Sequence, residues 1–141
     1  MEEHVGIMGR KVDFSGGRLF WFYWFPLILY CLAIFIQSAY PSPQCLPVFP
    51  YGDKVLHFAA YAVMCALFFR ALLATYPQRQ IALIVLLSIL FTTLYGVGDE
   101  FHQLFVVSRT ADRMDVAADF LGGTFGAVCF WMVKGFLGRR S

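Results

Sequence analysis

Charged residues are scarce in this chain of 141 residues, because only 14% of them are Asp, Glu, Lys or Arg. Ordinary soluble domains carry about 25% charged residues. Hydrophobic residues make up 60% of the sequence, and this share excludes an ordinary soluble domain. The 11 basic and 9 acidic residues leave a net charge of only +2, which gives no case for nucleic acid as a partner.

Several motifs that carry chemistry are absent. No C-x-x-C pair occurs among the four cysteines, so a redox or zinc-ribbon protein is not indicated. No G-x-x-x-x-G-K-[ST] phosphate loop and no dinucleotide fingerprint occur either, so this chain does not supply energy from nucleotide hydrolysis. We find no internal repeat, and we expect a single domain over residues 1–141 that needs no cofactor.

Long apolar runs are what the sequence does contain. A helix that spans a bilayer needs about 20 mostly apolar residues, with a range of about 17–25. Four blocks meet this requirement, and two of them contain no formal charge. We therefore predict an all-α polytopic membrane protein, a bundle of four transmembrane helices. The predicted parts are a tail over 1–18, spans over about 19–39, 55–75, 81–98 and 115–134, and outer loops over 40–54 and 99–114.

The distribution of Lys and Arg predicts the orientation. With four spans the two termini share one side of the membrane, together with the loop between the second and third spans. That side carries 8 of the 11 basic residues, and the other side carries Lys54, Arg109 and Arg113. The positive-inside rule then places both termini in the cytoplasm. Most acidic residues fall on the opposite, outer side, which makes the outer face polar and mixed in sign.

Polar residues gather at three predicted helix ends on this outer side. At 100° per residue, each group falls within an arc of about 60–100° on one helix face. The groups are Asp53, Lys54, His57 and Tyr61; Asp99, Glu100 and Gln103; and Asp115 and Asp119 with Gly122 and Gly126. Arg109 lies in the loop between the last two groups. His102 points away from the polar arc of its helix.

Asp119 is the most deeply placed of the carboxylates in the fourth block. A charge inside a span is costly, so it is expected to face protein rather than lipid. Gly122 and Gly126 share its face and form a G-x-x-x-G pair, the spacing that lets two helices approach closely. We infer a small polar cavity that opens outward, with Asp53, Gly122 and Gly126 as structural or lining residues.

The residue types in this cavity suggest roles. His57 is a candidate general base or acid, and Asp99 or Glu100 is expected to orient it or to share the proton transfer. Arg109 and Lys54 are candidates for holding an anionic head group. The remaining candidate substrate-binding residues are Tyr61, Gln103, Asp115 and Asp119. A metal held by His57 with Asp99 or Glu100 is the less favoured alternative, because no tight ligand spacing supports it, and we expect no metal.

Simpler roles compete for some of these residues. Asp112 is better explained as a helix cap than as a catalyst. Asp115 could instead complete a capping pair, and Arg109 could instead clamp Asp115 or Glu100. Tyr61 could be an interfacial anchor.

Taken together, the motifs resemble the VanZ-like family. The residues that carry the resemblance are Asp53-Lys54-x-x-His57-x-x-x-Tyr61, Asp99-Glu100-x-x-Gln103, Arg109 with Asp115, and Gly122 with Gly126. Members usually have Asn where this chain has Asp119. The resemblance implies a small multi-pass protein of a bacterial cytoplasmic membrane, and the namesake is linked to resistance to the lipoglycopeptide teicoplanin.

Three functions fit the sequence. The first is an enzyme that acts on an anionic lipid or lipid-linked cell-envelope molecule at the outer, extracytoplasmic face. The second is a binder of a lipid head group, a lipid-linked cell-wall precursor or the antibiotic, without catalysis. The third is a proton-coupled transporter, which is disfavoured because the titratable residues stop near the outer ends of the spans. The expected partners are therefore membrane lipids, and the oligomeric state is left open.

Overall fold

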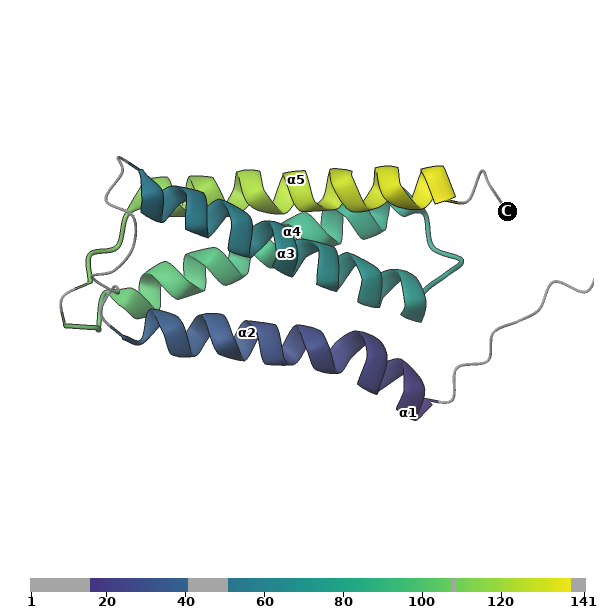
Figure 1. Ribbon diagram of the computed structural model, residues 1–141, viewed down its shortest axis with the longest axis horizontal. Coiled ribbons are helices and arrows are strands. Elements are labelled where there is room, and N and C mark those ends of the chain that lie inside the picture. Colours follow the sequence, from purple (N-terminus) through teal and green to yellow (C-terminus); the bar gives the residue numbers. More distant parts are fainter. Residues whose placement is uncertain (1–15, 41–50, 108, 138–141) are drawn as a thin grey trace, which may run out of the picture.

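The computed structural model describes residues 16–40, 51–107 and 109–137. All of the regular secondary structure in these ranges is helical, and it includes four long helices (Figure 1). Each is long and apolar enough to cross a membrane, which confirms the predicted fold class. The orientation of the termini stays a prediction. Most of the tail predicted over 1–18 and of the outer loop predicted over 40–54 lies outside the described residues.

The first long helix is continuous but not uniform. It begins as α1 (Gly16–Leu19), passes through a π-helical segment, η1 (Phe20–Trp24), and continues as α2 (Phe25–Ser38). Pro26 lies at the start of α2, directly after the π-helical segment, and because it has no N–H it removes one hydrogen bond from the continuous helix. Arg70 stabilises the π-helical segment, because its Nη2 donates to the carbonyl of Phe22 at 2.6 Å.

The other three helices are α3 (Gly52–Thr75), α4 (Ile81–Gln103) and α5 (Arg113–Leu137). The apolar run of α4 ends at Gly98, but its helix continues through Asp99 and Glu100 to Gln103. The last turn of α4 therefore places polar side chains beyond the apolar part of the bundle.

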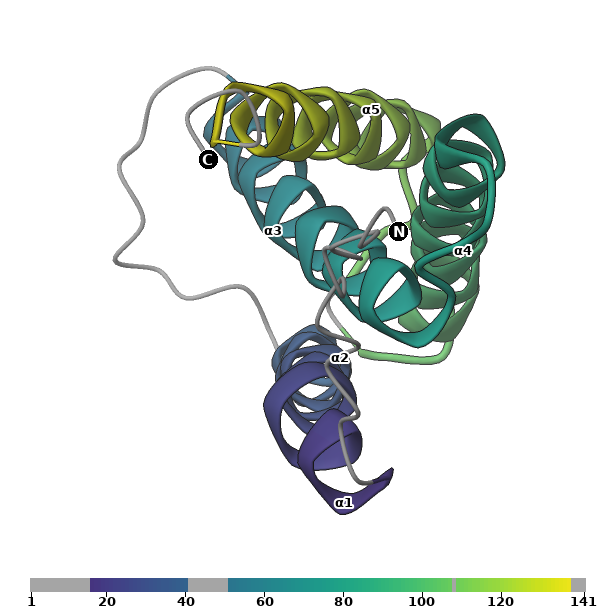
Figure 2. The ribbon, with the colours of Figure 1, turned by 90° about the vertical axis from the view of Figure 1, so that its right-hand side faces the viewer.

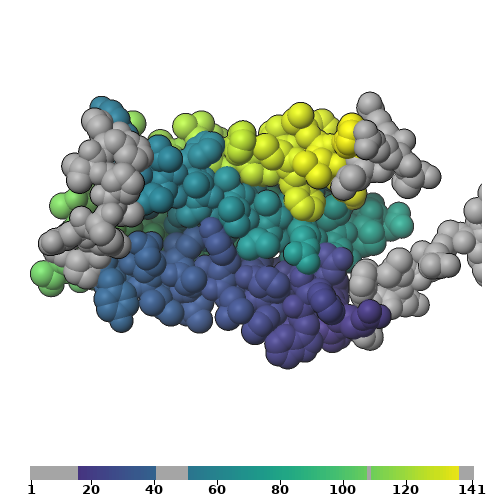
Figure 3. Space-filling view, viewed as in Figure 1, coloured from purple at the N-terminus to yellow at the C-terminus, as the bar shows by residue number. Residues whose placement is uncertain are grey.

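Viewed from its end, the bundle shows α3, α4 and α5 packed around one another, with α1 and α2 set against them as a separate arm (Figure 2). The core between α3, α4 and α5 consists of Cys65, Phe69, Leu72, Ile84 and Ala127. In the space-filling view α2 lies along the neighbouring helices as its own layer (Figure 3).

Hydrogen bonds hold this separate arm in place. Tyr30 Oη donates to the carbonyl of Ala60 at 3.0 Å, and Tyr95 Oη donates to that of Cys31 at 2.7 Å. Trp24 Nε1 donates to Thr75 Oγ1 at 3.0 Å near the other end. In an apolar environment such bonds between helices add to the packing of the bundle.

Large apolar side chains remain exposed on all four long helices, among them Leu32, Val63, Leu86, Leu94, Phe125 and Trp131. This is the surface expected of helices whose neighbours are lipid chains rather than water. The first described residue and the end of α5 lie at the same end of the bundle, and the polar helix ends lie at the other (Figure 1).

Candidate functional site

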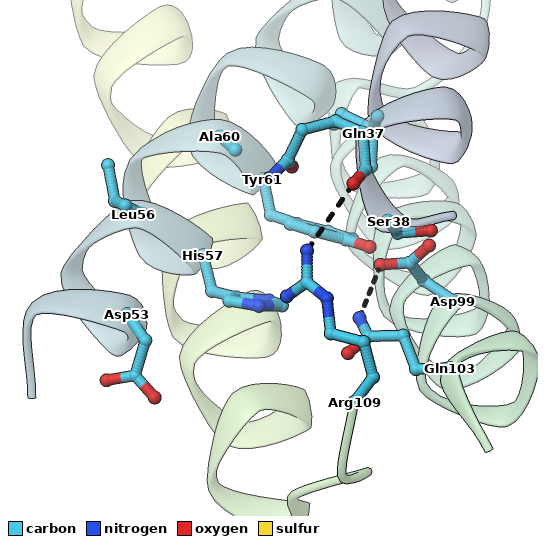
Figure 4. Close-up of a pocket in the computed structure, with 11 residues that line it drawn as sticks. Gln37, Ser38, Asp53, Leu56, His57, Ala60, Tyr61, Asp99, Gln103 and Arg109 are labelled. Atoms are coloured by element: carbon cyan, nitrogen blue, oxygen red, sulfur yellow. Dashed lines mark hydrogen bonds between the residues drawn. The ribbon is translucent and has the colours of Figure 1, made fainter. Parts of the chain in front are cut away.

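A pocket of about 320 Å³ lies at the polar end of the bundle, between α2, α3, α4 and the segment that follows α4 (Figure 4). One part of its wall is apolar and comes from α2 and α3. The rest is polar. The lining residues are Ile34, Gln37, Ser38, Asp53, Leu56, His57, Ala60, Tyr61, Asp99, Gln103 and Arg109.

His57 is paired with a fully buried carboxylate behind the pocket wall. Its Nδ1 lies 2.9 Å from Oδ1 of Asp119, which is 0% exposed. Gly96 on α4 makes room for this carboxylate, since a Cβ there would lie 2.5 Å from Asp119 Oδ2. The sequence had favoured Asp99 or Glu100 as the orienting group, and the structure gives that hydrogen bond to Asp119.

The Asp119 contact fixes the chemistry of the His57 ring. An ionised carboxylate only accepts hydrogen bonds, so we assign the hydrogen of the neutral ring to Nδ1. Nε2 then carries an unshared lone pair. A ring oriented in this way by a carboxylate is suited to accept a proton or to bind a metal.

Tyr61 packs beside this histidine. Its ring lies nearly parallel to that of His57, with centroids 6.0 Å apart. The residue is 1% exposed, and its hydroxyl has no hydrogen-bond partner among the described residues. A buried hydroxyl without a partner is costly, so a ligand that bonded to it would be favoured.

Lys54 is occupied by three carboxylates. Its Nζ lies 2.7 Å from Asp112 Oδ2, 2.7 Å from Asp115 Oδ1 and 3.1 Å from Asp53 Oδ2. These contacts join the start of α3 to the start of α5. Lys54 was a candidate for binding the head group. In the structure its ammonium group forms ion pairs with these three acidic side chains.

Asp112 caps α5, as its position suggested. Its Oδ1 accepts a hydrogen bond from the backbone N–H of Met114 at 2.9 Å. The Lys54 ammonium, together with that N–H, holds the pKa of the Asp112 carboxyl below its usual value. The backbone N–H of Asp112 donates to Glu100 Oε2 at 2.8 Å, which ties the end of α4 to the start of α5.

The carboxylates of Asp99 and Glu100 are both buried, each 6% exposed. Gln103 Nε2 donates to Asp99 Oδ2 at 3.2 Å and to Glu100 Oε1 at 3.3 Å. Asp99 Oδ1 has no donor among the described residues. Gln103 therefore holds both carboxylates in place, and Oδ1 of Asp99 stays buried beside the pocket without a described donor.

Arg109 reaches back to the end of α2. Its Nε donates to the carbonyl of Tyr40 at 3.0 Å, and its Nη2 donates to that of Gln37 at 3.4 Å. No ion pair joins it to Asp115 or Glu100 within the described ranges. In the close-up its guanidinium points into the pocket (Figure 4). A guanidinium has five N–H donors, so groups remain for an anion.

The glycine pair lies against α3. A Cβ on Gly122 would collide with the carbonyl oxygen of Phe58, and one on Gly126 would collide with that of Ala62. This close approach of α5 to α3 brings Asp119 within reach of His57.

The structure brings the predicted site residues together in two layers. Asp53, His57, Tyr61, Asp99, Gln103 and Arg109 line the pocket. Glu100, Asp115 and Asp119 lie behind His57, and Lys54 joins Asp115 to Asp53. His102 lies apart, with its ring stacked on Phe35 and its Nδ1 3.4 Å from Ser38 Oγ.

Sequence reasoning missed the contribution of the first helix to the pocket. Gln37 and Ser38 are polar residues at the end of a long apolar run, and this was the available signal. Ile34, Leu56 and Ala60 carried no signal, because they are indistinguishable from other apolar residues in their helices.

Four apolar helices with a polar pocket at one end define a polytopic membrane protein. Its site faces one end of the bundle rather than a channel through it. The chain belongs to the VanZ/LLP1 family, whose model matches residues 14–134.

A curated relative is the uncharacterized protein C11E3.10 of Schizosaccharomyces pombe, 30% identical over 96 residues. The match covers 68% of this chain and 56% of that protein, so the chain spans little more than half of the relative's length. No solved structure matches the chain.

Proposed function

We propose that the protein binds the anionic, phosphate-bearing head group of a membrane lipid or lipid-linked envelope molecule in this pocket and acts on it. The observation that carries the proposal is that the pocket wall has an apolar part and a polar part next to each other. Ile34, Leu56 and Ala60 suit an acyl or isoprenoid chain, while His57 and Arg109 suit a charged head group.

Arg109 is the residue we assign to anion binding. Its guanidinium group donates hydrogen bonds to two backbone carbonyls, so the side chain is already ordered before a ligand binds. Guanidinium groups bind phosphate through paired hydrogen bonds, which gives both strength and orientation. The unpartnered Tyr61 hydroxyl is a further donor for the head group.

Two lone pairs beside the pocket have no hydrogen bond from a described donor. One is on Nε2 of His57, which Asp119 orients, and the other is on the buried Oδ1 of Asp99. After a small side-chain rotation, either group can take the proton of a water as the water oxygen bonds to the phosphorus. The bond between the phosphorus and one ester oxygen then breaks, and the proton passes to that departing oxygen. We assign the site to the extracytoplasmic face of the membrane, following the predicted orientation.

A non-catalytic binder is the second candidate. Ser38 is the one hydroxyl nucleophile of the Ser or Thr type among the described lining residues, and its Oγ donates to the carbonyl of Phe35 at 3.1 Å. A covalent mechanism through this residue is therefore not favoured. Such a binder would hold the same head group, or a lipoglycopeptide such as teicoplanin, and alter its access to cell-wall precursors.

Proton-coupled transport receives less support. The half of the bundle away from the pocket has an apolar core around Phe69, Leu72 and Ile84. A proton relay across a membrane needs titratable groups along the whole path.

The test compares lipid extracts from cells without the protein and from cells that produce the wild type, His57→Ala or His102→Phe. His102→Phe is the matched control, because it removes an imidazole at the same end of the bundle and keeps the stacking on Phe35. If the protein is an enzyme, the amount of one lipid species changes in cells that produce the wild type or His102→Phe. The amount stays the same in cells without the protein and in cells that produce His57→Ala.

Two other outcomes decide against catalysis by this site. Unchanged lipids, with a lipid or antibiotic that copurifies with the wild type and not with His57→Ala, would identify the binder. A stable His57→Ala protein that changes the lipids as the wild type does would contradict the proposal.

A further inference from the structure

Three potential metal ligands converge behind the pocket wall. They are a ring nitrogen of His57 and one carboxylate oxygen each of Glu100 and Asp115, and the three atoms lie within 4.8 Å of one another. We take the nitrogen to be Nε2, because Nε2 lies 4.0 Å from Asp115 Oδ2 whereas Nδ1 is bonded to Asp119. We propose that His57, Glu100 and Asp115 form a binding site for a divalent transition cation, Mn²⁺ or Zn²⁺. The cation would take part in binding the head group, and this role rests on the proposed function.

The charge balance at this end of the bundle favours a cation. Six carboxylates meet here, on Asp53, Asp99, Glu100, Asp112, Asp115 and Asp119. Lys54 contacts three of them, and His57 contacts Asp119 at 2.9 Å. Asp99 and Glu100 are each 6% exposed, and neither forms an ion pair within the described residues. A bound cation would stabilise the ionised form of these buried carboxyl groups.

One carboxylate oxygen of Asp115 lies beside His57 without a described hydrogen-bond donor. Asp115 is 7% exposed, and its Oδ1 is bound by Lys54 at 2.7 Å. Its Oδ2 lies 4.0 Å from His57 Nε2, which is too far for a hydrogen bond. Within the described ranges no donor serves this oxygen. The imidazole nitrogen and the carboxylate oxygen thus lie close together without a hydrogen bond between them.

The orientation of the His57 ring also suits a metal ligand. Metal-binding histidines almost always donate their other ring N–H to a carboxylate or carbonyl, which fixes the ring and strengthens the ligand. Asp119 supplies this contact to Nδ1 of His57. Mixed imidazole and carboxylate ligands suit zinc and manganese better than calcium, which takes oxygen ligands.

The spacing fits a site that tightens on binding. A point equally distant from three atoms 4.8 Å apart lies about 2.8 Å from each, whereas zinc lies about 2.0–2.2 Å from such ligands. Small rotations of the three side chains close this difference. Glu100 is held by the Asp112 N–H and Gln103, and Asp115 by Lys54, so these side chains start close to the required positions.

A cation here would also explain how an acidic site accepts an anion. Without it, a phosphate entering beside His57 would meet Asp99, Glu100 and Asp115. With it, the phosphate gains a positive charge opposite Arg109. Asp99, which lines the pocket and is outside the ligand set, remains the group for proton transfer.

The experiment uses the full chain in detergent, stripped with a chelator and titrated with Mn²⁺, without added lipid. The electron paramagnetic resonance signal of free Mn²⁺ reports binding. We expect one ion per wild-type chain, and affinities at least about tenfold weaker in Glu100→Gln and Asp115→Asn. Asp112→Asn is the control, because it removes a neighbouring carboxylate outside the ligand set and keeps the helix cap.

The melting temperature of each variant without metal shows whether the variant is folded. Adding Mn²⁺ should raise the melting temperature of the wild type and of Asp112→Asn. It should leave the melting temperatures of Glu100→Gln and Asp115→Asn nearly unchanged. A wild-type protein that leaves the Mn²⁺ signal unchanged would overturn the proposal. So would an Asp112→Asn variant that loses as much affinity as the ligand variants.

A separate lipid-binding measurement by native mass spectrometry distinguishes the two proposals. A protein that retains lipid but takes up no Mn²⁺ lacks the cation site and keeps the proposed function. A protein that binds Mn²⁺ with the expected variant pattern but retains no lipid keeps the site and loses the proposed function.

Discussion

At the scale of single residues, the contact between His57 and Asp119 is the structural feature on which the site depends. It joins the second long helix to the last one through a hydrogen bond of 2.9 Å, and it sets the free lone pair on Nε2. Asp119 has no exposed surface, and its Oδ2 has no donor within the described part of the chain. We therefore expect Asp119 to position His57 rather than to bind substrate, the role that the sequence had suggested for it.

A pair of substitutions tests this role. Asp119→Asn keeps a carbonyl oxygen that can accept from Nδ1, so we expect function within about tenfold of the wild type. Asp119→Leu has a similar size but no acceptor, and the orphaned imidazole N–H should reduce function about 10–100-fold. The measurements are the lipid change in cells and the melting temperature in detergent.

The comparison between the two variants decides the matter. If Asp119→Asn folds well but loses as much function as Asp119→Leu, the negative charge itself is needed, and Asp119 does more than position the ring.

At the scale of helices, the close approach of α5 to α3 places the site. Gly122 and Gly126 face the carbonyls of Phe58 and Ala62, with no room for a side chain. The start of α5 then lies beside the start of α3, which allows Lys54 to reach Asp112 and Asp115. The geometry of the pocket thus depends on two glycines that lie outside it.

Gly122→Ala and Gly126→Ala should each lower the free energy of unfolding by about 1–3 kcal/mol, because the added methyl group forces the helices apart. Gly135→Ala is the control, since a Cβ at that position of α5 meets nothing within 4 Å. Thermal unfolding in detergent measures the effect. Equal stability of Gly122→Ala and Gly135→Ala would show that the helices do not pack as described.

The helices themselves were the predictable part of the fold. Apolar runs of 18 residues or more identify spans without any knowledge of packing, and the four long helices follow from them. The faces of Asp53, His57 and Asp99 were predictable in the same way, because they depend only on position along one helix.

The pairing across helices was not predictable from one sequence. Whether His57 contacts Asp119, Asp99 or Glu100 depends on the rotation of each helix about its axis and on its depth in the bundle. The pattern of hydrophobic residues fixes neither of these two quantities precisely. The bonds of Arg109 to backbone carbonyls were hidden for a related reason. Every residue has a carbonyl, so the sequence does not show which carbonyls will be available.

At the scale of the whole molecule, the candidate site residues lie at one end of the bundle. The beginning of α1 and the end of α5 lie at the other end (Figure 1). The positive-inside rule applied to the loops and tails puts that other end in the cytoplasm. The pocket would then face outward, where it meets the outer leaflet and its lipids.

Reporter fusions at the C-terminus test this orientation. We expect a fluorescent protein fused there to be bright in bacterial cells and alkaline phosphatase fused there to be inactive, because the basic terminal segments stay inside. The same reporters fused after residue 107 should give the reverse pattern. Active phosphatase at the C-terminus would place the pocket at the cytoplasmic face.

The central claim is that a lipid head group occupies the pocket between α2 and α3, and photocrosslinking measures this most directly. The purified protein is reconstituted with a phospholipid analogue that carries a photoreactive group near its phosphate, and the labelled residues are mapped by mass spectrometry. We predict labelling concentrated at Ile34–Ser38 and Leu56–Tyr61, and at least about tenfold less in Arg109→Gln, which loses the charged fork. Labelling spread evenly over lipid-facing residues such as Leu86 and Leu94, and unchanged by Arg109→Gln, would contradict the claim.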